Sequence, residues 1–363
     1  EALVRCIQRE GTPARVHHIE LFLDPEVQDA VCERFDLADG LDTNDPYYTL
    51  KRTIALQRFL GYDYVRCGLE DFTMPMRRTA IEDTARLQRE AGRSFIEEHR
   101  GPITTWEEFE TYPWPDPWAA STRSLEWYEA NLPEDMCVIG SGGFAHFSEY
   151  LTWLMGYETL CYALYDQRDL VQAISEKLFA LYDICIQRML QFERVKIIWG
   201  SDDMGFKTGT LISPDDLREY VLPGHNRMAQ AAHQAGRPYL LHSSGQLGAI
   251  LDDLIDAAQI EPTIVVTPDG RAGDWLGSMW ANSELYGPVR DHVTSEVIGF
   301  IDGTYNTLPV KESRSIMGFS MGGDGSMVIG LLHRDLFAAW ASHSGLLDFE
   351  TTLEWLSDYI VQE

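Results

Sequence analysis

The chain has 363 residues, of which 45% are hydrophobic and 24% are charged, a balance that supports a large apolar core and excludes a disordered protein. The 57 acidic residues outnumber the 29 Lys and Arg, which gives a formal net charge of −28 and argues against nucleic acid as a partner. The sequence contains no run of 18 or more apolar residues, and its first residues lack the basic and apolar pattern of a secretory signal. We therefore expect a cytoplasmic protein that does not contact membranes.

Short β-branched runs alternate with long amphipathic stretches along the chain. Eight runs are predicted as buried parallel strands, at 16–21, 64–67, 137–140, 196–200, 238–242, 263–267, 314–319 and 337–342. Helices are predicted at 170–192, 213–234, 295–300, 321–332 and 350–361. Eight strands, each followed by a helix, are the count of a (β/α)8 TIM-type barrel, and the chain length fits that α/β fold.

The segment 101–118 interrupts this alternation. It is rich in Trp and Pro, and Pro removes a backbone donor from helices and sheets alike. We expect an inserted loop that packs through its aromatic rings.

Polar side chains follow three of the predicted strands. Glu20 ends the first strand, Asp202 and Asp203 follow the fourth, and His242 and Ser244 lie at the end of the fifth. A barrel gathers such residues at one mouth, where its chemistry takes place. Each also has a structural explanation, because aspartates cap loops and a histidine at a strand end is often a hydrogen-bonded wall residue.

Three further residues are candidates for binding a substrate in this mouth. Lys207 is a partner for Glu20 or a contact for a substrate anion, and Phe144 and His146 follow the third strand as predicted pocket lining. Core packing explains the aromatic ring equally well.

Four segments resemble the uroporphyrinogen decarboxylase superfamily, in particular its decarboxylase-like members related to corrinoid-dependent methyltransferases. They are VHHIELFLDPEV (16–27), GGFAHFSEYLTWLMGYETL (142–160), GSDDMGFKTGTLISPDDLREYVLP (200–223) and GRPYLLHSSGQLGAILDDLIDA (236–257). The resemblance covers about residues 1–258 and implies a (β/α)8 barrel that acts on a small molecule.

Two departures from that superfamily bear on the chemistry. The arginine-rich segment with which true uroporphyrinogen decarboxylases bind substrate carboxylates has no counterpart near 21–24. The related methyltransferases bind zinc through a His-any residue-Cys motif, whereas Ser244 stands here in the place of the thiolate after His242. A zinc site of that type is therefore not expected, and His242 with Asp202 or Asp203 is the remaining candidate for a metal site.

From residue 262 onward the sequence resembles a different family. PTIVVTPDG (262–270), EVIGFIDGTYNT (296–307) and SRSIMGFSMGGDGSMVIGLLHRDLFAAWASHSGLLDF (313–349) look like the putative esterase family of α/β-hydrolases, which includes S-formylglutathione hydrolase relatives. GFSMG (318–322) matches the GxSxG nucleophile elbow, with Ser320 as the nucleophile and Met321 as the residue whose backbone N–H would bind the oxyanion.

The rest of a catalytic triad is not evident after Ser320. In α/β-hydrolases the acid and the base follow the serine on later strands. His333 lies within the predicted elbow helix and His343 at the end of the next strand, so neither occupies the position of the family's base. Esterase activity is therefore in doubt at this stage.

The two resemblances meet between 257 and 262, which predicts a decarboxylase-like region at 1–260 and an esterase-like region at 261–363. The first region supplies five strands and the second three, so we expect the esterase-like strands to complete the eight-stranded barrel. The alternative is a partial barrel beside a partial α/β-hydrolase sheet. Closure of the barrel would pair the strand edges that a lone three-stranded sheet leaves exposed.

Three functions remain open at this point. The first is decarboxylase-like or methyltransferase-like chemistry on a small molecule, with Asp202, Asp203, His242 and Glu20 as catalytic candidates, and with a corrinoid protein as partner if methyl transfer is the reaction. The second is ester hydrolysis by Ser320. The third is a chimeric or truncated product without turnover.

Overall fold

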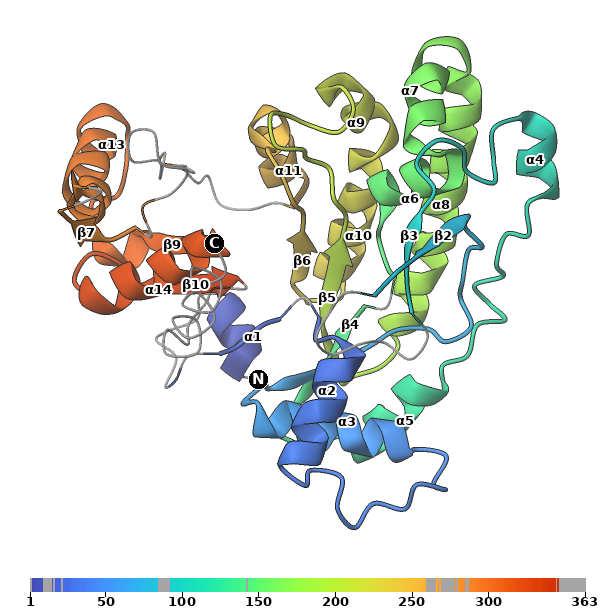
Figure 1. Cartoon of the computed structure of the whole chain (residues 1–363), viewed down its shortest axis with the longest axis horizontal. Helices are drawn as coiled ribbons and strands as arrows, with labels where there is room; N and C mark the ends of the chain where they lie inside the picture. The colour runs from blue at the N-terminus through green and yellow to red at the C-terminus, as the bar shows by residue number, and fades with distance from the viewer. Residues whose placement is uncertain are drawn as a thin grey trace. The chain divides into compact units, whose positions relative to one another are not determined.

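The computed structural model describes residues 2–8, 15, 17–20, 22–83, 92–141, 143–258, 266, 268, 278, 280–284, 287–343 and 345 (Figure 1). The chain divides into two compact units, Glu1–Pro262 (unit 1) and Thr263–Glu363 (unit 2). Both mix helices with parallel strands. None of the helices in the described residues has the length and apolar character needed to cross a membrane.

Unit 1 is built on a four-stranded parallel sheet. Its strands are β1 (Tyr64–Cys67), β4 (Cys137–Gly140), β5 (Val195–Ser201) and β6 (Tyr239–His242), in the order β1-β4-β5-β6. Each strand therefore pairs with the strand of this sheet that comes next along the chain. Every connection between two such strands contains helices. This sequential winding is the one used by (β/α) barrels.

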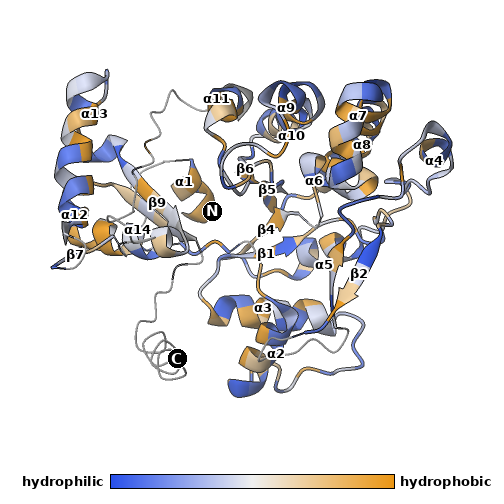
Figure 2. Ribbon diagram, turned by 45° about the horizontal axis from the view of Figure 1, so that its top comes forward, coloured by the Kyte–Doolittle hydropathy of each residue, from blue (hydrophilic) through white to orange (hydrophobic). Residues whose placement is uncertain are grey.

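Eleven helices and a short hairpin complete the described part of unit 1. The helices are α1 (Ala2–Ile7), α2 (Pro25–Arg34), α3 (Tyr48–Phe59), α4 (Trp106–Thr111), α5 (Arg123–Asn131), α6 (Phe147–Met155), α7 (Tyr157–Asp166), α8 (Arg168–Met189), α9 (Pro214–Tyr220), α10 (Leu222–Gln234) and α11 (Leu251–Ala258), with a 3₁₀ turn at Gly248–Ile250. The hairpin pairs β2 (Arg78–Ile81) with β3 (Arg93–Ile96). Helices α7 to α10 carry both hydrophilic and hydrophobic colours in Figure 2, as amphipathic helices do.

Both faces of the sheet are buried. One face packs against α8 and α10, in a core that includes Val138, Ile198, Leu178 and Met228. The side chains that alternate with these along the strands point to the opposite face, where they form a second hydrophobic cluster that α1 partly covers. This second cluster consists of Leu3, Tyr64, Cys137, Ile139, Ile197 and Trp199. Burial on both sides explains the almost continuous apolar character of these strands.

Four of the predicted strands are confirmed in this sheet, but the predicted strand at 16–21 is wrong in its described part. Residues 17–20 form no strand. Side chains hold this segment instead, because the Tyr64 hydroxyl contacts both the N–H and the carbonyl of Glu20, at 2.9 and 3.3 Å, and His17 Nδ1 lies 2.6 Å from an Asp63 oxygen.

Two helix predictions also need correction. The single helix expected at 213–234 is interrupted at Val221, because the proline ring of Pro223 would clash with a carbonyl of the preceding turn. The loop expected at 101–118 contains the short helix α4, which Thr105 caps by accepting the N–H of Glu108, and which ends before Pro113.

Unit 2 centres on two parallel strands, β9 (Ser315–Phe319) and β10 (Ala339–His343), connected by α14 (Met321–Leu332). It also contains α12 (Val289–Asp291), a π-helix at His292–Val297, α13 (Ile298–Thr304), a 3₁₀ turn at Lys311–Ser313 and the hairpin β7 (Asn282–Ser283) with β8 (Gly287–Pro288). Its described core is Val293, Ile329 and Phe337, with Trp280 and Ile316 packed against it.

The eight-stranded barrel remains a prediction. In the described residues β9 and β10 pair only with each other, in a sheet separate from β1-β4-β5-β6. Most of the predicted strand 263–267 and all of the predicted helix 350–361 lie outside the described residues. What the structure establishes is a mixed α/β chain with parallel pairing in both units.

Ile139→Ala should destabilise unit 1 by about 2–5 kcal/mol, because Ile139 is fully buried at the centre of β4 and the cavity left behind would not be refilled. The matched control is Ile81→Ala on β2, where the side chain is 47% exposed, and there we expect a cost below about 1 kcal/mol. Urea unfolding followed by far-ultraviolet circular dichroism measures both. Equal losses for the two variants would contradict the placement of the core.

Candidate functional site

Asp202 is the most highly connected polar residue at the carboxyl end of the unit 1 sheet. It directly follows β5 and is fully buried. Its carboxylate accepts the backbone N–H groups of Ser148 and Glu149, both at 2.9 Å, and lies 2.8 Å from His225 Nε2. The N–H groups belong to the first turn of α6, where helix donors lack partners within the helix and attract negative charge.

His225 extends this network to β6. It lies on α10, is 2% exposed, and its Nδ1 is 3.0 Å from the Tyr239 hydroxyl. That hydroxyl lies against Gly200, where an added Cβ would be only 2.2 Å away, so β5 accommodates Tyr239 only because residue 200 is glycine. Burial raises the pKa of Tyr239 well above its ordinary value, so the phenol stays protonated. The network therefore joins β5, β6, α6 and α10.

Asp203 and His242 form a more open pair beside this network. Asp203 Oδ1 accepts the Ser244 N–H at 2.8 Å and lies 3.8 Å from His242 Nε2. His242 Nε2 is also 3.5 Å from the Ser244 hydroxyl. The structure thus brings Asp203, His242 and Ser244 together, as the positions of their strands predict. Unlike Asp202, this group is accessible to a ligand, because the Asp203 side chain is 45% exposed.

A His–Glu pair lies in the first turn of α6. His146 Nδ1 is 2.5 Å from Glu149 Oε2. Burial raises the pKa of the Glu149 carboxyl above its ordinary value of 4.5; the hydrogen bond to His146 opposes this shift, and the charges of Asp202 and Asp203 add to it. Sequence analysis selected His146 but missed Glu149, although the i, i+3 spacing on a helix places the two side chains together.

The remaining candidates of unit 1 have separate surroundings. Glu20 is held through its backbone by Tyr64, as described above. Phe144 is buried against Tyr182, with ring centroids 5.4 Å apart, so it belongs to the core. Lys207 is exposed in the loop after β5.

Metal binding finds no support in the described part of the chain. Within it, no three His, Cys, Asp or Glu side chains are grouped closely enough to hold an ion. His242 and Asp203 provide two donors, and Asp202 is already engaged with Ser148, Glu149 and His225.

Ser320 lies in unit 2, at the turn between β9 and α14. Its backbone has φ 52° and ψ −121°, a conformation that is strained for any residue with a side chain. The turn is tight, because a Cβ on Gly318 would lie 2.1 Å from the Gly322 carbonyl oxygen. These are the features of a nucleophile elbow, in which a strained strand-to-helix turn exposes the serine.

The backbone around Ser320 leaves two donors open. The Ser320 carbonyl accepts the N–H groups of Gly323 and Asp324, at 2.8 and 3.2 Å. Met321 and Gly322 begin α14, so their N–H groups have no partner within the helix. None of the described residues accepts a hydrogen bond from either N–H. This is the position that an oxyanion would occupy.

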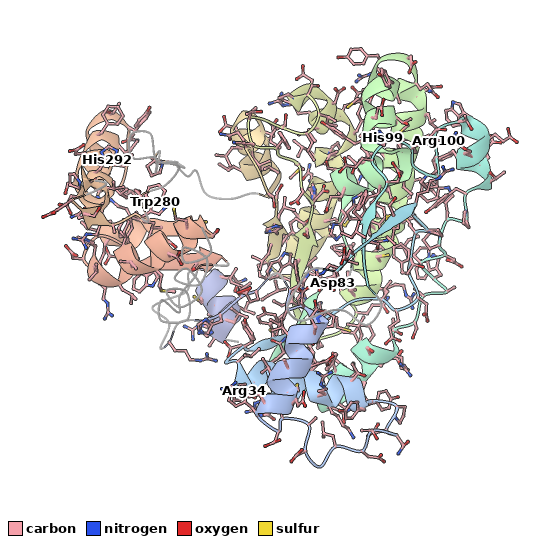
Figure 3. All side chains as sticks on the ribbon, in the orientation of Figure 1. Arg34, Asp83, His99, Arg100, Trp280 and His292 are labelled. Atoms are coloured by element: carbon pink, nitrogen blue, oxygen red, sulfur yellow. The ribbon has the colours of Figure 1, made fainter. Side chains whose placement is uncertain are left out.

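Close packing holds α14 against its surroundings. Trp280 lies against Gly325, where a Cβ would approach the indole to 2.5 Å, and Figure 3 shows Trp280 beside this helix. The Ser326 hydroxyl donates to the Ala341 carbonyl of β10 at 2.7 Å. The turn that carries Ser320 is thus supported by a helix fixed on two sides, a relation that sequence analysis did not detect.

Unit 2 contains three histidines, each of which differs in its position relative to Ser320. His333 follows the last residue of α14, so the helix of 12 residues separates it from Ser320 by about 18 Å. His292 lies 2.8 Å from Glu296 on the helical segment before α13. The backbone of His343 is in register with Phe319, the residue before Ser320. Among the described side chains no histidine or carboxylate hydrogen-bonds the Ser320 hydroxyl.

Comparison with known proteins supports an esterase-type segment. A family model described as "Putative esterase" matches residues 240–356. Esterase MT1326 and Esterase Rv1288, from the CDC 1551 / Oshkosh and ATCC 25618 / H37Rv strains of Mycobacterium tuberculosis, are each 30% identical to this chain over 102 residues. The matches cover 26% of this chain and 22% of each relative, so the chain spans less than a quarter of their length. The comparisons add no support for the resemblance of residues 1–258 to uroporphyrinogen decarboxylases.

Glu149→Gln should stabilise unit 1 increasingly as the pH rises. A carboxyl whose pKa is raised by folding stabilises the protein fully below its ordinary pKa, and that contribution is lost as the pH rises through the folded value. The variant cannot ionise and does not lose this contribution. The free energy of unfolding of the variant minus that of the wild type should therefore increase from about pH 4 to about pH 7, as measured by urea unfolding at each pH.

Glu108→Gln is the control for this experiment. Hydrogen bonds from Thr104 lower the pKa of Glu108, so the wild type should gain on this variant as the pH rises to about 5, and the difference should then stay constant up to about pH 7. If both variants show the same trend with pH, the assigned surroundings of Glu149 are wrong.

Gly318→Ala should destabilise unit 2 by about 1–3 kcal/mol, because the methyl group would overlap the Gly322 carbonyl. Gly303→Ala on α13 is the matched control: an added Cβ there meets nothing within 4 Å, and alanine favours a helix by up to about 1 kcal/mol. Thermal unfolding by calorimetry distinguishes them. A tolerated Gly318→Ala would mean that the tight turn is not present.

Proposed function

We propose that unit 2 carries out ester cleavage with Ser320 as the nucleophile. The observation that carries the proposal is the backbone of Ser320, at φ 52° and ψ −121° between β9 and α14. Strain of this kind persists at functional sites when the surrounding structure enforces it. The family match at 240–356 independently favours the same chemistry.

The chemistry follows from the groups at the turn. The Ser320 hydroxyl oxygen would attack the ester carbonyl carbon, and the resulting oxyanion would accept the Met321 N–H, and the Gly322 N–H if it lies within reach. The alcohol then leaves, and water hydrolyses the acyl-serine. Backbone donors that are already in place need no reorganisation as charge develops.

A base is needed to take the serine proton, and we assign His343 to this role. The register of β9 and β10 pairs it with Phe319, at the same end of the strands as Ser320. It also follows the serine in the chain, although it lies closer to the serine than the base of α/β-hydrolases does.

Unit 1 supports a second candidate function, proton transfer on a small molecule of the decarboxylase-like kind. The order β1-β4-β5-β6 favours an arc of a (β/α)8 barrel for residues 1–258. Asp203, His242 and the His146–Glu149 pair are the candidate acids and bases. We assign Asp202 a positioning role instead, because three hydrogen bonds already occupy its carboxylate.

Ser320→Ala should abolish both hydrolysis of p-nitrophenyl acetate and labelling by a fluorophosphonate probe. The matched control is Ser313→Ala, an exposed serine of the same unit, which should retain both. His343→Gln should slow hydrolysis by about 100-fold or more if it acts as the base. Mass spectrometry of the labelled peptide locates the adduct. Labelling that persists in Ser320→Ala, or that is absent in the wild type, would contradict the proposal.

A further inference from the structure

Arg66 is a partly buried cation on the face of the unit 1 sheet opposite α8 and α10. It is the third residue of β1, and alternation along the strand places it on the same face as Tyr64. Its guanidinium carbon lies 4.9 Å from the ring centroid of Trp199 on β5, and its Nε donates to the Ser141 hydroxyl at 3.1 Å. These two contacts fix the plane of the guanidinium.

This guanidinium has no carboxylate partner among the described side chains, although the chain carries 57 acidic residues. Two other arginines of unit 1 are paired with carboxylates: Arg227, whose side chain is 52% exposed, lies 5.2 Å from the ring centroid of Phe179 and binds Asp183 at 3.0 Å, and Arg93 binds both Asp83 and Glu26. Burial lowers the pKa of Arg66, and the interaction with Tyr64 opposes this shift. Buried charges in proteins are normally paired, so this cation lacks the counterion that its position calls for.

The donors of Arg66 remain available to a ligand. A guanidinium carries five N–H donors in a fixed fork, and the described contacts of Arg66 use only Nε. Its two terminal nitrogens have no hydrogen-bond partner among the described residues. An anion bound to these nitrogens would therefore replace no hydrogen bond from a described protein group.

We propose that Arg66 binds the carboxylate of a small molecule at the carboxyl end of the unit 1 sheet. The terminal nitrogens match the two oxygens of a carboxylate in a bidentate pair. A single cation balances a single negative charge, and the acidic protein as a whole repels dianions such as phosphate. The site belongs to unit 1 and is independent of ester cleavage at Ser320.

Binding of benzoate to the full chain tests this proposal, with benzamide as its uncharged counterpart. In isothermal titration at low ionic strength, benzoate should bind at least about tenfold more tightly than benzamide, since a hydrogen bond to a charged group contributes that much. Arg66→Gln should abolish this preference, and Arg66→Lys should retain part of it, because a point charge replaces the fork. Arg227→Gln is the matched control and should behave as the wild type.

A second readout needs no variant. Phenylglyoxal modifies accessible arginines, so it should label Arg66 in the wild type, and benzoate but not benzamide should protect it, as mass spectrometry of the peptide would show. Three results would overturn the proposal: no preference for benzoate, a preference that survives Arg66→Gln, or stronger protection of Arg66 by inorganic phosphate than by benzoate.

Discussion

The start of a helix at the end of a parallel strand is the constraint on which both candidate sites depend. The first N–H groups of such a helix lack partners within the helix and must find an acceptor. In unit 1 the protein supplies that acceptor, because the Asp202 carboxylate binds the first turn of α6 and is held in turn by His225. Asp202 therefore fixes α6 and α10 to the strand ends, and the accessible groups, Asp203 and His242, lie on this frame.

In unit 2 the same kind of junction is left open. The Ser320 carbonyl binds the N–H groups of Gly323 and Asp324, which leaves those of Met321 and Gly322 for an incoming group. A buried carboxylate at this point would have stabilised the helix but blocked the oxyanion position. The close packing of Trp280 on Gly325 holds α14 in place, and this packing helps to maintain the strained turn at Ser320.

Local patterns predicted the elements that depend on local forces. The β-branched runs at 64–67 and 137–140 match β1 and β4 residue for residue, and 321–332 matches α14. The strand at 16–21 failed because contacts from the distant Tyr64 and Asp63 hold that segment, and the helix at 213–234 failed because Pro223 interrupts it. Site residues divide in the same way: the GxSxG motif revealed Ser320, whereas the link from Asp202 to His225 spans 23 residues and left no local signal.

The crystal structure of the chain after reaction with a p-nitrophenyl phosphonate ester tests the central claim, that the junction before α14 is open and reactive, most directly. The account predicts phosphorus bonded to Ser320 Oγ, with the phosphoryl oxygen accepting the Met321 N–H. An unmodified Ser320, or an adduct whose phosphoryl oxygen faces away from the start of α14, would contradict it.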